Sequence, residues 1–235
     1  MKALAELERL QNVSRNSHPS KWEQAQGSIL KIFSLNCHSL PNKIEDLRND
    51  PFALKSDIIC LTETWLQSDT ALDTMEIPGY DVSHNSLGKG KGVSTYFRYN
   101  MGKPSVTVNR QKVQISMLET EEVNVINIYR SQGADNQEIM RDLLQMISKD
   151  KPSLICGDFN LCYIDERDNQ ITRMLEDQNF KQLVTEASHF QGGHIDHVYS
   201  NLNPAMFEIE VSMYSPYYTS RDHDGFCTSI THKQK

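Results

Sequence analysis

The chain has no apolar stretch that approaches the roughly 20 residues needed to span a bilayer. Its first nine positions, 1–9, are rich in charge and lack the apolar core of a secretory signal. We therefore expect a protein that does not enter a membrane and that works in the nucleus or the cytoplasm.

Cysteine is scarce, and its spacing excludes two common uses. Five cysteines are present, and no two of them form a Cys-x-x-Cys pair. Cys60 and Cys156 lie inside apolar runs, where a thiol behaves as a small hydrophobic residue. We expect reduced thiols rather than a disulfide framework or a zinc site.

An excess of positive charge is also missing. The formal net charge is −7, whereas proteins that grip nucleic acid usually present a basic surface. Carboxylates that surround a metal ion count as negative in such a tally, although the ion offsets them in the folded protein. One local group of basic residues is present: Lys89, Lys91, Arg98, Lys103, Arg110 and Lys112. The overall charge therefore gives no support for nucleic-acid binding, which has to rest on motifs.

The 235 residues suit one large α/β domain. Residues 1–27 are predicted to form a leader, with a short amphipathic helix followed by a polar linker that contains Pro19. An ordinary packed N-terminal helix is an equal alternative for this part. Residues 28–232 mix short apolar strands with helices, a pattern that favours two sheets packed face to face with helices outside.

The strands and helices are expected at definite places. Strands are predicted at 29–35, 57–62, 93–97, 113–118, 123–128, 153–157, 195–200, 207–213 and 226–230. Helices are predicted within 41–55, behind Asp135 and Glu138 at 139–147, at 170–179 and at 182–187.

Polar side chains follow three of the predicted strands directly. Asn36, Glu63 and Asp158 each stand where an apolar run ends. Strand ends are rigid platforms for functional groups. A single polar residue there is usually only the start of a loop, but the repetition at three strands favours a shared site.

The sharpest local motif is Gly157-Asp158-Phe159-Asn160. Gly157 permits a tight exit from the strand, and Asp158 and Asn160 share a face when the backbone is extended. One of them can act on a water while the other holds a phosphate oxygen. Gly, Asp and Asn are also ordinary turn residues, so the motif has a purely structural alternative.

Two histidine-containing segments lie near the C-terminus. Asp196 falls on a predicted strand between apolar neighbours, where a carboxylate needs a partner and a histidine is a natural one. His194 and His197 face opposite sides of that strand, so we expect both to be solvated rather than to bind zinc. Asp222 and His223 offer a carboxylate and a histidine, or alternatively an acidic surface turn.

The candidate residues together favour hydrolysis that is assisted by a metal ion. The sequence has no Gly-x-x-x-x-Gly-Lys-Ser/Thr loop, and no serine or cysteine stands out as a nucleophile. Oxygen-rich side chains favour Mg²⁺ or Mn²⁺, which can polarise a phosphoryl oxygen. Tyr129, at the end of a predicted strand, is either a core tyrosine or a phosphate contact.

These segments, taken in order, resemble the endonuclease/exonuclease/phosphatase superfamily, whose fold is a DNase I-like, four-layer α/β sandwich of two sheets flanked by helices. The resemblance runs from about residue 28 to residue 230. Within the superfamily, Glu63-Thr64-Trp65-Leu66 and the stretch 192–198 resemble endonuclease domains of LINE-type retrotransposons and Helitron-like mobile elements. Arg221 departs from the pattern, because the family usually places serine directly before Asp-His.

The resemblance implies a role for each matching position. It implies that Glu63 binds the metal ion, that Asn36 and Asp222 contribute to the metal site, and that Asp158 orients or deprotonates the attacking water. It also implies that Asn160 and Tyr129 contact the scissile phosphate and that Asp196 orients His223, which stabilises the transition state. Ser188 matches a threonine that contacts substrate.

The resulting expectation is a Mg²⁺- or Mn²⁺-dependent endonuclease that nicks duplex DNA. We expect a monomer that originated as part of a larger mobile-element polyprotein. One alternative keeps the chemistry but changes the substrate to an abasic site, a 3′ end, a phosphoinositide or a sphingolipid. Another is a captured domain that binds DNA or a protein without catalysis.

Overall fold

The computed structural model describes residues 28–148, 150–163, 169–184, 186–189, 191–219 and 222–233. The predicted leader, residues 1–27, lies outside the described residues, and so do Ser220 and Arg221.

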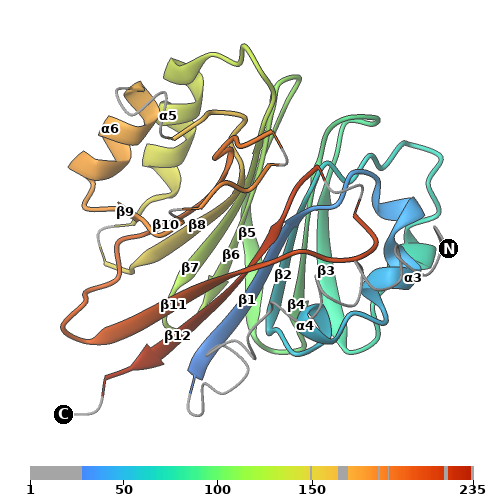
Figure 1. The fold of residues 1–235 in the computed structure, drawn as a ribbon, viewed down its shortest axis with the longest axis horizontal. Helices are drawn as coiled ribbons and strands as arrows, with labels where there is room; N and C mark the ends of the chain where they lie inside the picture. The colour runs from blue at the N-terminus through green and yellow to red at the C-terminus, as the bar shows by residue number, and fades with distance from the viewer. Residues whose placement is uncertain are drawn as a thin grey trace, which may run out of the picture.

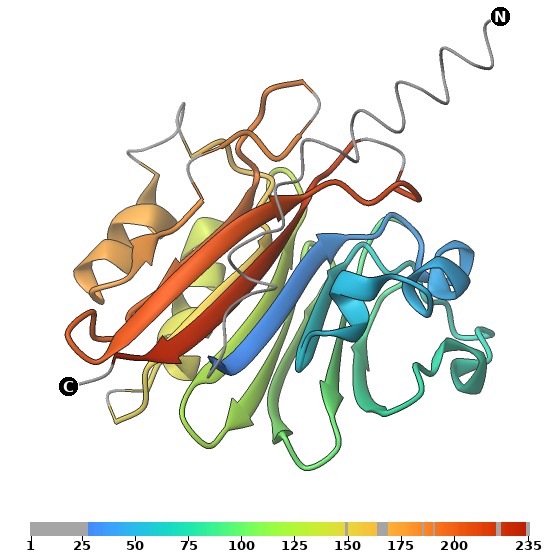
Figure 2. The ribbon, with the colours of Figure 1, turned by 60° about the horizontal axis from the view of Figure 1, so that its bottom comes forward.

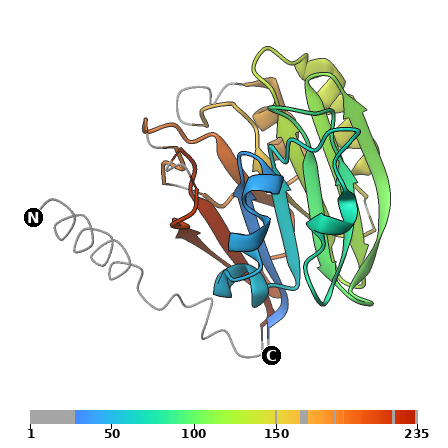
Figure 3. The same cartoon turned by 90° about the vertical axis from the view of Figure 1, so that its right-hand side faces the viewer.

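Two six-stranded mixed sheets form the body of the molecule (Figure 1). The first sheet contains, in spatial order, β11 (Phe207–Tyr214), β12 (Gly225–His232), β1 (Ser28–Asn36), β2 (Ile58–Thr62), β4 (Val93–Arg98) and β3 (Tyr80–Asn85). The second contains β5 (Gly102–Arg110), β6 (Val113–Thr120), β7 (Asn124–Arg130), β8 (Ser153–Asp158), β10 (Asp196–Ser200) and β9 (Lys181–Gln182). The first and last strands of the chain, β1 and β12, are antiparallel neighbours (Figure 2). The two sheets lie face to face (Figure 3).

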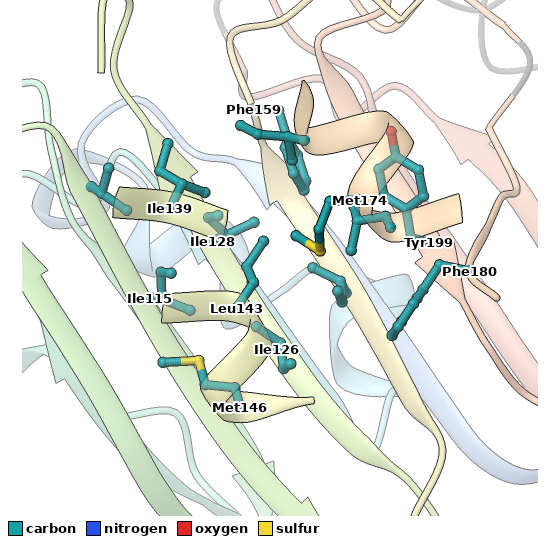
Figure 4. Close-up of a cluster of buried hydrophobic side chains, with 14 of the residues drawn as sticks. Ile115, Ile126, Ile128, Ile139, Leu143, Met146, Phe159, Met174, Phe180 and Tyr199 are labelled. Carbon is teal, nitrogen blue, oxygen red and sulfur yellow. The ribbon is translucent and has the colours of Figure 1, made fainter. Parts of the chain in front are cut away.

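Helices cover the outer face of each sheet. The helices α5 (Asn136–Met146) and α6 (Gln170–Asp177) lie over the second sheet, and their apolar side chains meet those of the strands beneath (Figure 4). The first sheet is covered by short pieces: η1 (Leu40–Asn42), α3 (Ile44–Leu47), α4 (Pro51–Leu54) and η2 (Leu72–Met75). The predicted four-layer sandwich is confirmed. Among the described residues, no helix is both long and apolar enough to cross a membrane.

The helix α5 shows why these segments become helical. The Asp135 side chain accepts a hydrogen bond from the Gln137 backbone N–H and so caps the first turn. Ile139, Leu143 and Met146 then recur on one face and are buried against the second sheet. The sequence prediction was confirmed here, including the capping role of Asp135.

The layer between the sheets changes from apolar to polar along its length. Side chains alternate across a strand, so every second residue points into this layer. In β1 the inward series is Ile32, Ser34 and Asn36, and in β8 it is Leu154, Cys156 and Asp158. The apolar members belong to the central core, and the polar members lie at one end of it.

Two predictions of secondary structure were wrong. Residues 182–187 were expected to be helical, but Lys181–Gln182 form β9, and the other described residues of that stretch are not helical. The Gln182 side-chain oxygen accepts from the Val198 backbone N–H, and the Leu183 N–H donates to the Val198 carbonyl, so pairing with β10 prevails over helix propensity. The strand β3 was not predicted, because Tyr80–Asn85 alternates polar residues and lacks an apolar run.

Candidate active site

The polar end of the inter-sheet layer gathers the predicted functional residues. In the second sheet, Tyr129 of β7 stands beside Asp158 of β8, and Asp158 stands beside Asp196 of β10. In the first sheet, Asn36 ends β1 next to Thr62 at the end of the parallel strand β2. Strand register therefore aligns these side chains within each sheet, and the packing of the two sheets brings Asn36 to Asp158.

Asp158 is fully buried and is held by three hydrogen bonds. Its Oδ1 accepts from the Asn160 backbone N–H at 2.8 Å, and its Oδ2 accepts from the side-chain amides of Asn36 at 2.9 Å and Asn160 at 3.1 Å. Burial raises the pKa of Asp158 well above its ordinary value, and the charges of Asp196 and Glu63 raise it further. A carboxylate in this setting is a basic group that is poised to take a proton.

Gly157 explains how Asp158 reaches this position. Its φ is +136°, and a Cβ at this residue would lie 2.0 Å from the Ile128 carbonyl oxygen of the neighbouring strand. Only glycine allows β7 and β8 to come so close. The turn then continues through Asn160, whose φ of +46° directs its amide back toward Asp158.

His223 pairs with Asp196 across the two sheets. The His223 Nδ1–H donates to Asp196 Oδ2 at 2.8 Å, and both side chains are largely buried. Burial by itself lowers the pKa of His223, but the hydrogen bond and charge of Asp196, with the charges of Asp158 and Glu63, raise it to about 9. The histidine is thus held as a cation whose Nε2 lies 3.4 Å from the Asn36 amide nitrogen.

Glu63 stands immediately after β2, in a tightly held backbone. Its φ is +49°, and its carbonyl accepts from the Ser39 N–H at 2.8 Å. Its charge is among those that raise the pKa of Asp158, Tyr129 and His223, so it belongs to the same electrostatic site. Its side chain is only partly buried, which leaves it accessible from solvent.

Tyr129 and Asp222 also lie at this end. The Tyr129 hydroxyl donates to the Gly90 carbonyl at 2.9 Å. Burial, and then the charge of Glu63, raise the pKa of Tyr129 to about 12, so the phenol stays protonated and able to donate. Asp222 is half-buried beside His223.

Ser188 was expected to contact substrate. Its side chain is completely buried, and its Oγ accepts from the Asp196 backbone N–H at 3.0 Å. Its carbonyl accepts from the Asp224 N–H, next to His223. A hydroxyl in this position holds the backbone of Asp196, and a contact between Ser188 and substrate stays a prediction.

His197 and the basic group depart from expectation. His197 was expected to be solvated, but it is buried on the outer face of the second sheet, where its ring stacks on Phe159 at 4.7 Å. The basic residues do not form one patch. Arg98 contacts the Leu54 carbonyl, Arg110 pairs with Asp142, and Lys103 lies 3.8 Å from a Glu119 oxygen. The other three members of the group, Lys89, Lys91 and Lys112, lie in the loops at the polar end.

Sequence reasoning missed Arg130. Its buried guanidinium donates from Nη1 to the carbonyls of Phe159 and Asn160, each at 3.1 Å, and the Asn160 amide donates to the Arg130 carbonyl. Arg130 therefore clamps the turn that carries Asp158 and Asn160. An arginine at the end of an otherwise apolar strand was the available signal, because a buried cation needs partners.

The donor set fits a hard divalent cation. Glu63, Asn36 and Asp222 offer oxygen atoms. The charges of Asp196 and Glu63 raise the pKa of Asp158, and the charges of all three carboxylates raise the pKa of His223, because negative charge is concentrated there. One oxygen or nitrogen atom each from Asp158, Asp196 and His223 lies within 4.8 Å of the others. Bound positive charge would offset this concentration.

The fold and this arrangement define a DNase I-like α/β sandwich protein. The model of the Endonuclease/Exonuclease/phosphatase family matches residues 33–215, so the chain belongs to that family. Members of the family are hydrolases that act on phosphodiester bonds, generally with divalent metal ions.

Solved structures show the same fold at low sequence identity. The endonuclease domain of TRAS1, a telomere-specific non-LTR retrotransposon, has a TM-score of 0.64 at 13% identity and covers 87% of this chain and 99% of that domain. The 3′-5′ exonuclease NExo from Neisseria meningitidis has a TM-score of 0.67 at 17% identity, with 86% and 100% covered. An AP endonuclease from Archaeoglobus fulgidus has a TM-score of 0.65 at 15% identity, with 88% and 100% covered. No curated protein matches the chain by sequence at a significant level.

Proposed function

We propose that this protein is a Mg²⁺- or Mn²⁺-dependent endonuclease that nicks duplex DNA, as in target-site cleavage by a mobile element. The observation that carries the proposal is that hydrogen bonds join Asn36 to Asp158 and His223 to Asp196 across the two sheets, with His223 Nε2 3.4 Å from the Asn36 amide nitrogen. The charge of Glu63 acts on the same groups. This set contains a buried base, a cationic histidine and oxygen donors for a metal ion.

The residues divide the work of phosphodiester hydrolysis among them. Glu63, with Asn36 and Asp222, would hold the divalent ion, which would supply positive charge to polarise a phosphoryl oxygen. Asp158 accepts the proton of the attacking water, and its orientation is fixed by Asn36 and Asn160.

The remaining groups act on the phosphate. Asn160 and Tyr129 contact the scissile phosphate with their amide and hydroxyl. His223, kept cationic and oriented by Asp196, places positive charge where negative charge grows on the phosphorus oxygens.

Loops at the same end of the molecule supply cations for a nucleic acid. Lys89 and Lys91 lie in the loop before β4, and Lys91 Nζ contacts the Gln111 side chain of the next loop at 2.9 Å. Lys112 lies in that second loop and contacts the Gly133 carbonyl. Three lysines around an acidic site suit contact with phosphates on both sides of a cleaved bond. With so few phosphate contacts, we expect weak intrinsic affinity for DNA.

Substrates other than an intact duplex keep the same chemistry. The similar structures include an AP endonuclease and a Neisseria 3′ phosphatase solved with a product DNA hairpin. The second candidate function is therefore cleavage at an abasic site or removal of a group from a 3′ end. A phosphoinositide or sphingolipid substrate and a non-catalytic DNA- or protein-binding role are further alternatives that the same assay separates.

The test is relaxation of supercoiled plasmid in the presence of Mg²⁺, with chelator as the blank. Asp158→Ala and His223→Ala should each lower the nicking rate by about 10²–10⁴-fold, the range expected for loss of a general base or an electrostatic stabiliser. Lys181→Ala, on an exposed strand outside the site, is the matched control and should nick at the wild-type rate.

Each possible result has a definite meaning. Unchanged nicking in both alanine variants would overturn the mechanism. Turnover of an abasic or 3′-phosphate oligonucleotide without nicking of plasmid would show that the substrate is damaged or end-modified DNA. Turnover of a phosphoinositide alone would show that the substrate is a lipid. Failure to cleave every substrate with Mg²⁺ and with Mn²⁺ would leave the non-catalytic alternative.

A further inference from the structure

Trp65 lies two residues after Glu63 and donates a hydrogen bond to it. The indole Nε1–H lies 3.1 Å from Glu63 Oε2, and His38 Nδ1 lies 3.6 Å from the same oxygen. Among the described residues, the other oxygen, Oε1, accepts no hydrogen bond. The two rings thus engage one oxygen of this carboxylate and leave the second available.

The backbone that presents Trp65 and Glu63 is unusual. Both residues have positive φ, +56° and +49°, a region that side chains other than glycine seldom adopt. Such a conformation costs about 1 kcal/mol or more for each residue and persists only where the surroundings enforce it. Two adjacent loops enforce it here.

Hydrogen bonds on both sides hold the segment. On one side, the Leu40 N–H donates to the Thr64 carbonyl at 3.0 Å. On the other side, the Trp65 N–H donates to the Lys91 carbonyl at 2.9 Å. The segment passes so close to Gly92 that a Cβ there would lie 2.6 Å from Thr64 Oγ1. The strained turn is therefore fixed in place, and it holds the indole N–H next to the carboxylate.

The indole ring is held as firmly as its backbone. The His38 ring lies 4.3 Å from the Trp65 ring, and Lys89 Nζ lies 5.7 Å from the centre of the ring. These contacts restrict rotation of the side chain and keep its N–H directed at Glu63.

We propose that Trp65 is a positioning residue for the metal ligand Glu63. By fixing Oε2, it would leave Oε1 to bind the cation from a side chain that is already oriented, so that less rotational freedom would be lost on binding. The inference rests on the proposed function, because it assumes that Glu63 binds the ion.

The experiment is direct titration of the full chain with Mn²⁺, followed calorimetrically and by the electron paramagnetic resonance signal of the free ion, in the absence of DNA. Trp65→Phe keeps an aromatic ring between His38 and Lys89 but removes the N–H donor. Loss of a partner that orients a ligand commonly weakens metal binding 10–100-fold, and we expect the Kd for Mn²⁺ to rise about tenfold. Tyr99→Phe, an exposed aromatic residue in the turn after β4, is the matched control and should keep the wild-type Kd.

Glu63→Gln separates failure of the inference from failure of the proposed function. If Glu63→Gln binds Mn²⁺ as tightly as the wild type, the metal assignment and the inference both fall. If Glu63→Gln loses binding while Trp65→Phe stays within twofold of the wild type, only the inference is overturned.

A second measurement covers the case in which Trp65→Phe does not fold. The chain has two tryptophans, so Trp22→Phe leaves Trp65 as the sole emitter. Addition of Mg²⁺ should then change the Trp65 emission. The Mg²⁺ concentration at the midpoint of this change should match the Kd for Mg²⁺ that is obtained from competition with Mn²⁺. A spectrum that is indifferent to Mg²⁺ would contradict a direct link between the indole and the metal ligand.

Discussion

The strands β8 and β10 are buried on both faces, and the ionisable side chains on the two faces differ in charge state. On the face toward the first sheet, Asp158 and Asp196 are buried beside a histidine that is kept cationic. On the face toward α5 and α6, His197 is buried among Phe159 and Tyr199, and burial lowers its pKa to about 4. The same strands thus carry charges on one side and a neutral imidazole on the other.

The partners on each face explain this difference. Asp196 and His223 neutralise each other across the two sheets, whereas His197 is packed among aromatic rings and hydrogen-bonds to backbone, with its Nε2–H donating to the His194 carbonyl at 2.8 Å. A buried ionisable group keeps its charge only where an opposite charge faces it. Charge at the site is therefore a product of sheet-on-sheet packing, and the covering helices contribute none.

The largest expected change in stability concerns the apolar part of the inner face. Leu154 lies four residues before Asp158 on the same face of β8 and is completely buried. Leu154→Ala should lower the free energy of unfolding by about 2–5 kcal/mol, because it leaves a cavity between the sheets. The nicking rate of the molecules that remain folded should stay close to that of the wild type.

Urea denaturation and nicking at low temperature measure these two quantities. Leu144→Ala, on the exposed side of α5, is the control and should change stability by less than about 0.5 kcal/mol. If Leu154→Ala is as stable as the wild type but does not nick DNA, then the apolar core and the candidate active site are not energetically independent along this face.

The next effect is the pH dependence of folding stability that arises from His197 on the outer face of the second sheet. His197 takes up a proton near pH 6.5 in the unfolded chain, but only near pH 4 in the folded protein. Its contribution to stability is therefore complete above pH 6.5 and is lost as the pH falls toward 4. The difference between these two pKa values, at roughly 1.4 kcal/mol for each pH unit, sets an upper limit of about 3.5 kcal/mol.

His197→Phe should remove this part of the acid sensitivity, so that its stability curve between pH 6.5 and 4 is flatter than that of the wild type. Tyr199→Phe alters the same cluster without removing a group that titrates in this range, and its curve should run parallel to the wild type. Parallel curves for His197→Phe and the wild type would mean that the buried imidazole is already charged.

The smallest expected effect follows from loss of the Ser188 hydroxyl, which accepts a hydrogen bond from the Asp196 backbone N–H. Ser188→Ala removes the acceptor of the Asp196 backbone N–H, which should cost about 1 kcal/mol of stability and lower kcat by less than about tenfold. The KM for DNA should not change if the hydroxyl acts only through the Asp196 backbone. A raised KM with an unchanged kcat would instead support Ser188 as a substrate contact.

The sequence was sufficient to predict the sandwich and most of its strands. Apolar runs that end in Asn36 and Asp158 gave the correct strands, because a buried strand needs a continuous apolar run and stops where polar groups begin. Register could not be read from the chain. The row of Tyr129, Asp158 and Asp196 depends on pairing between strands that lie far apart in sequence.

Burial of single side chains was the least predictable property. His197 was expected at the surface, because nothing in its neighbours in sequence reveals that the rings of Phe159 and Tyr163 pack against it. The burial of Ser188 was not predicted, because a local motif does not show which side of the loop the strand β10 occupies. Both depend on tertiary packing, which a pattern in one segment does not contain.

The pairing of β1 with β12 has a practical consequence. Ser28 and Thr231 are partners in register, at the end of the sheet opposite to Asn36. Fluorescent labels or affinity handles attached beside either strand would therefore lie close together, at the opposite end of the sheet from the candidate active site. Experiments on tethered or immobilised molecules can use this position without obstructing access to that site.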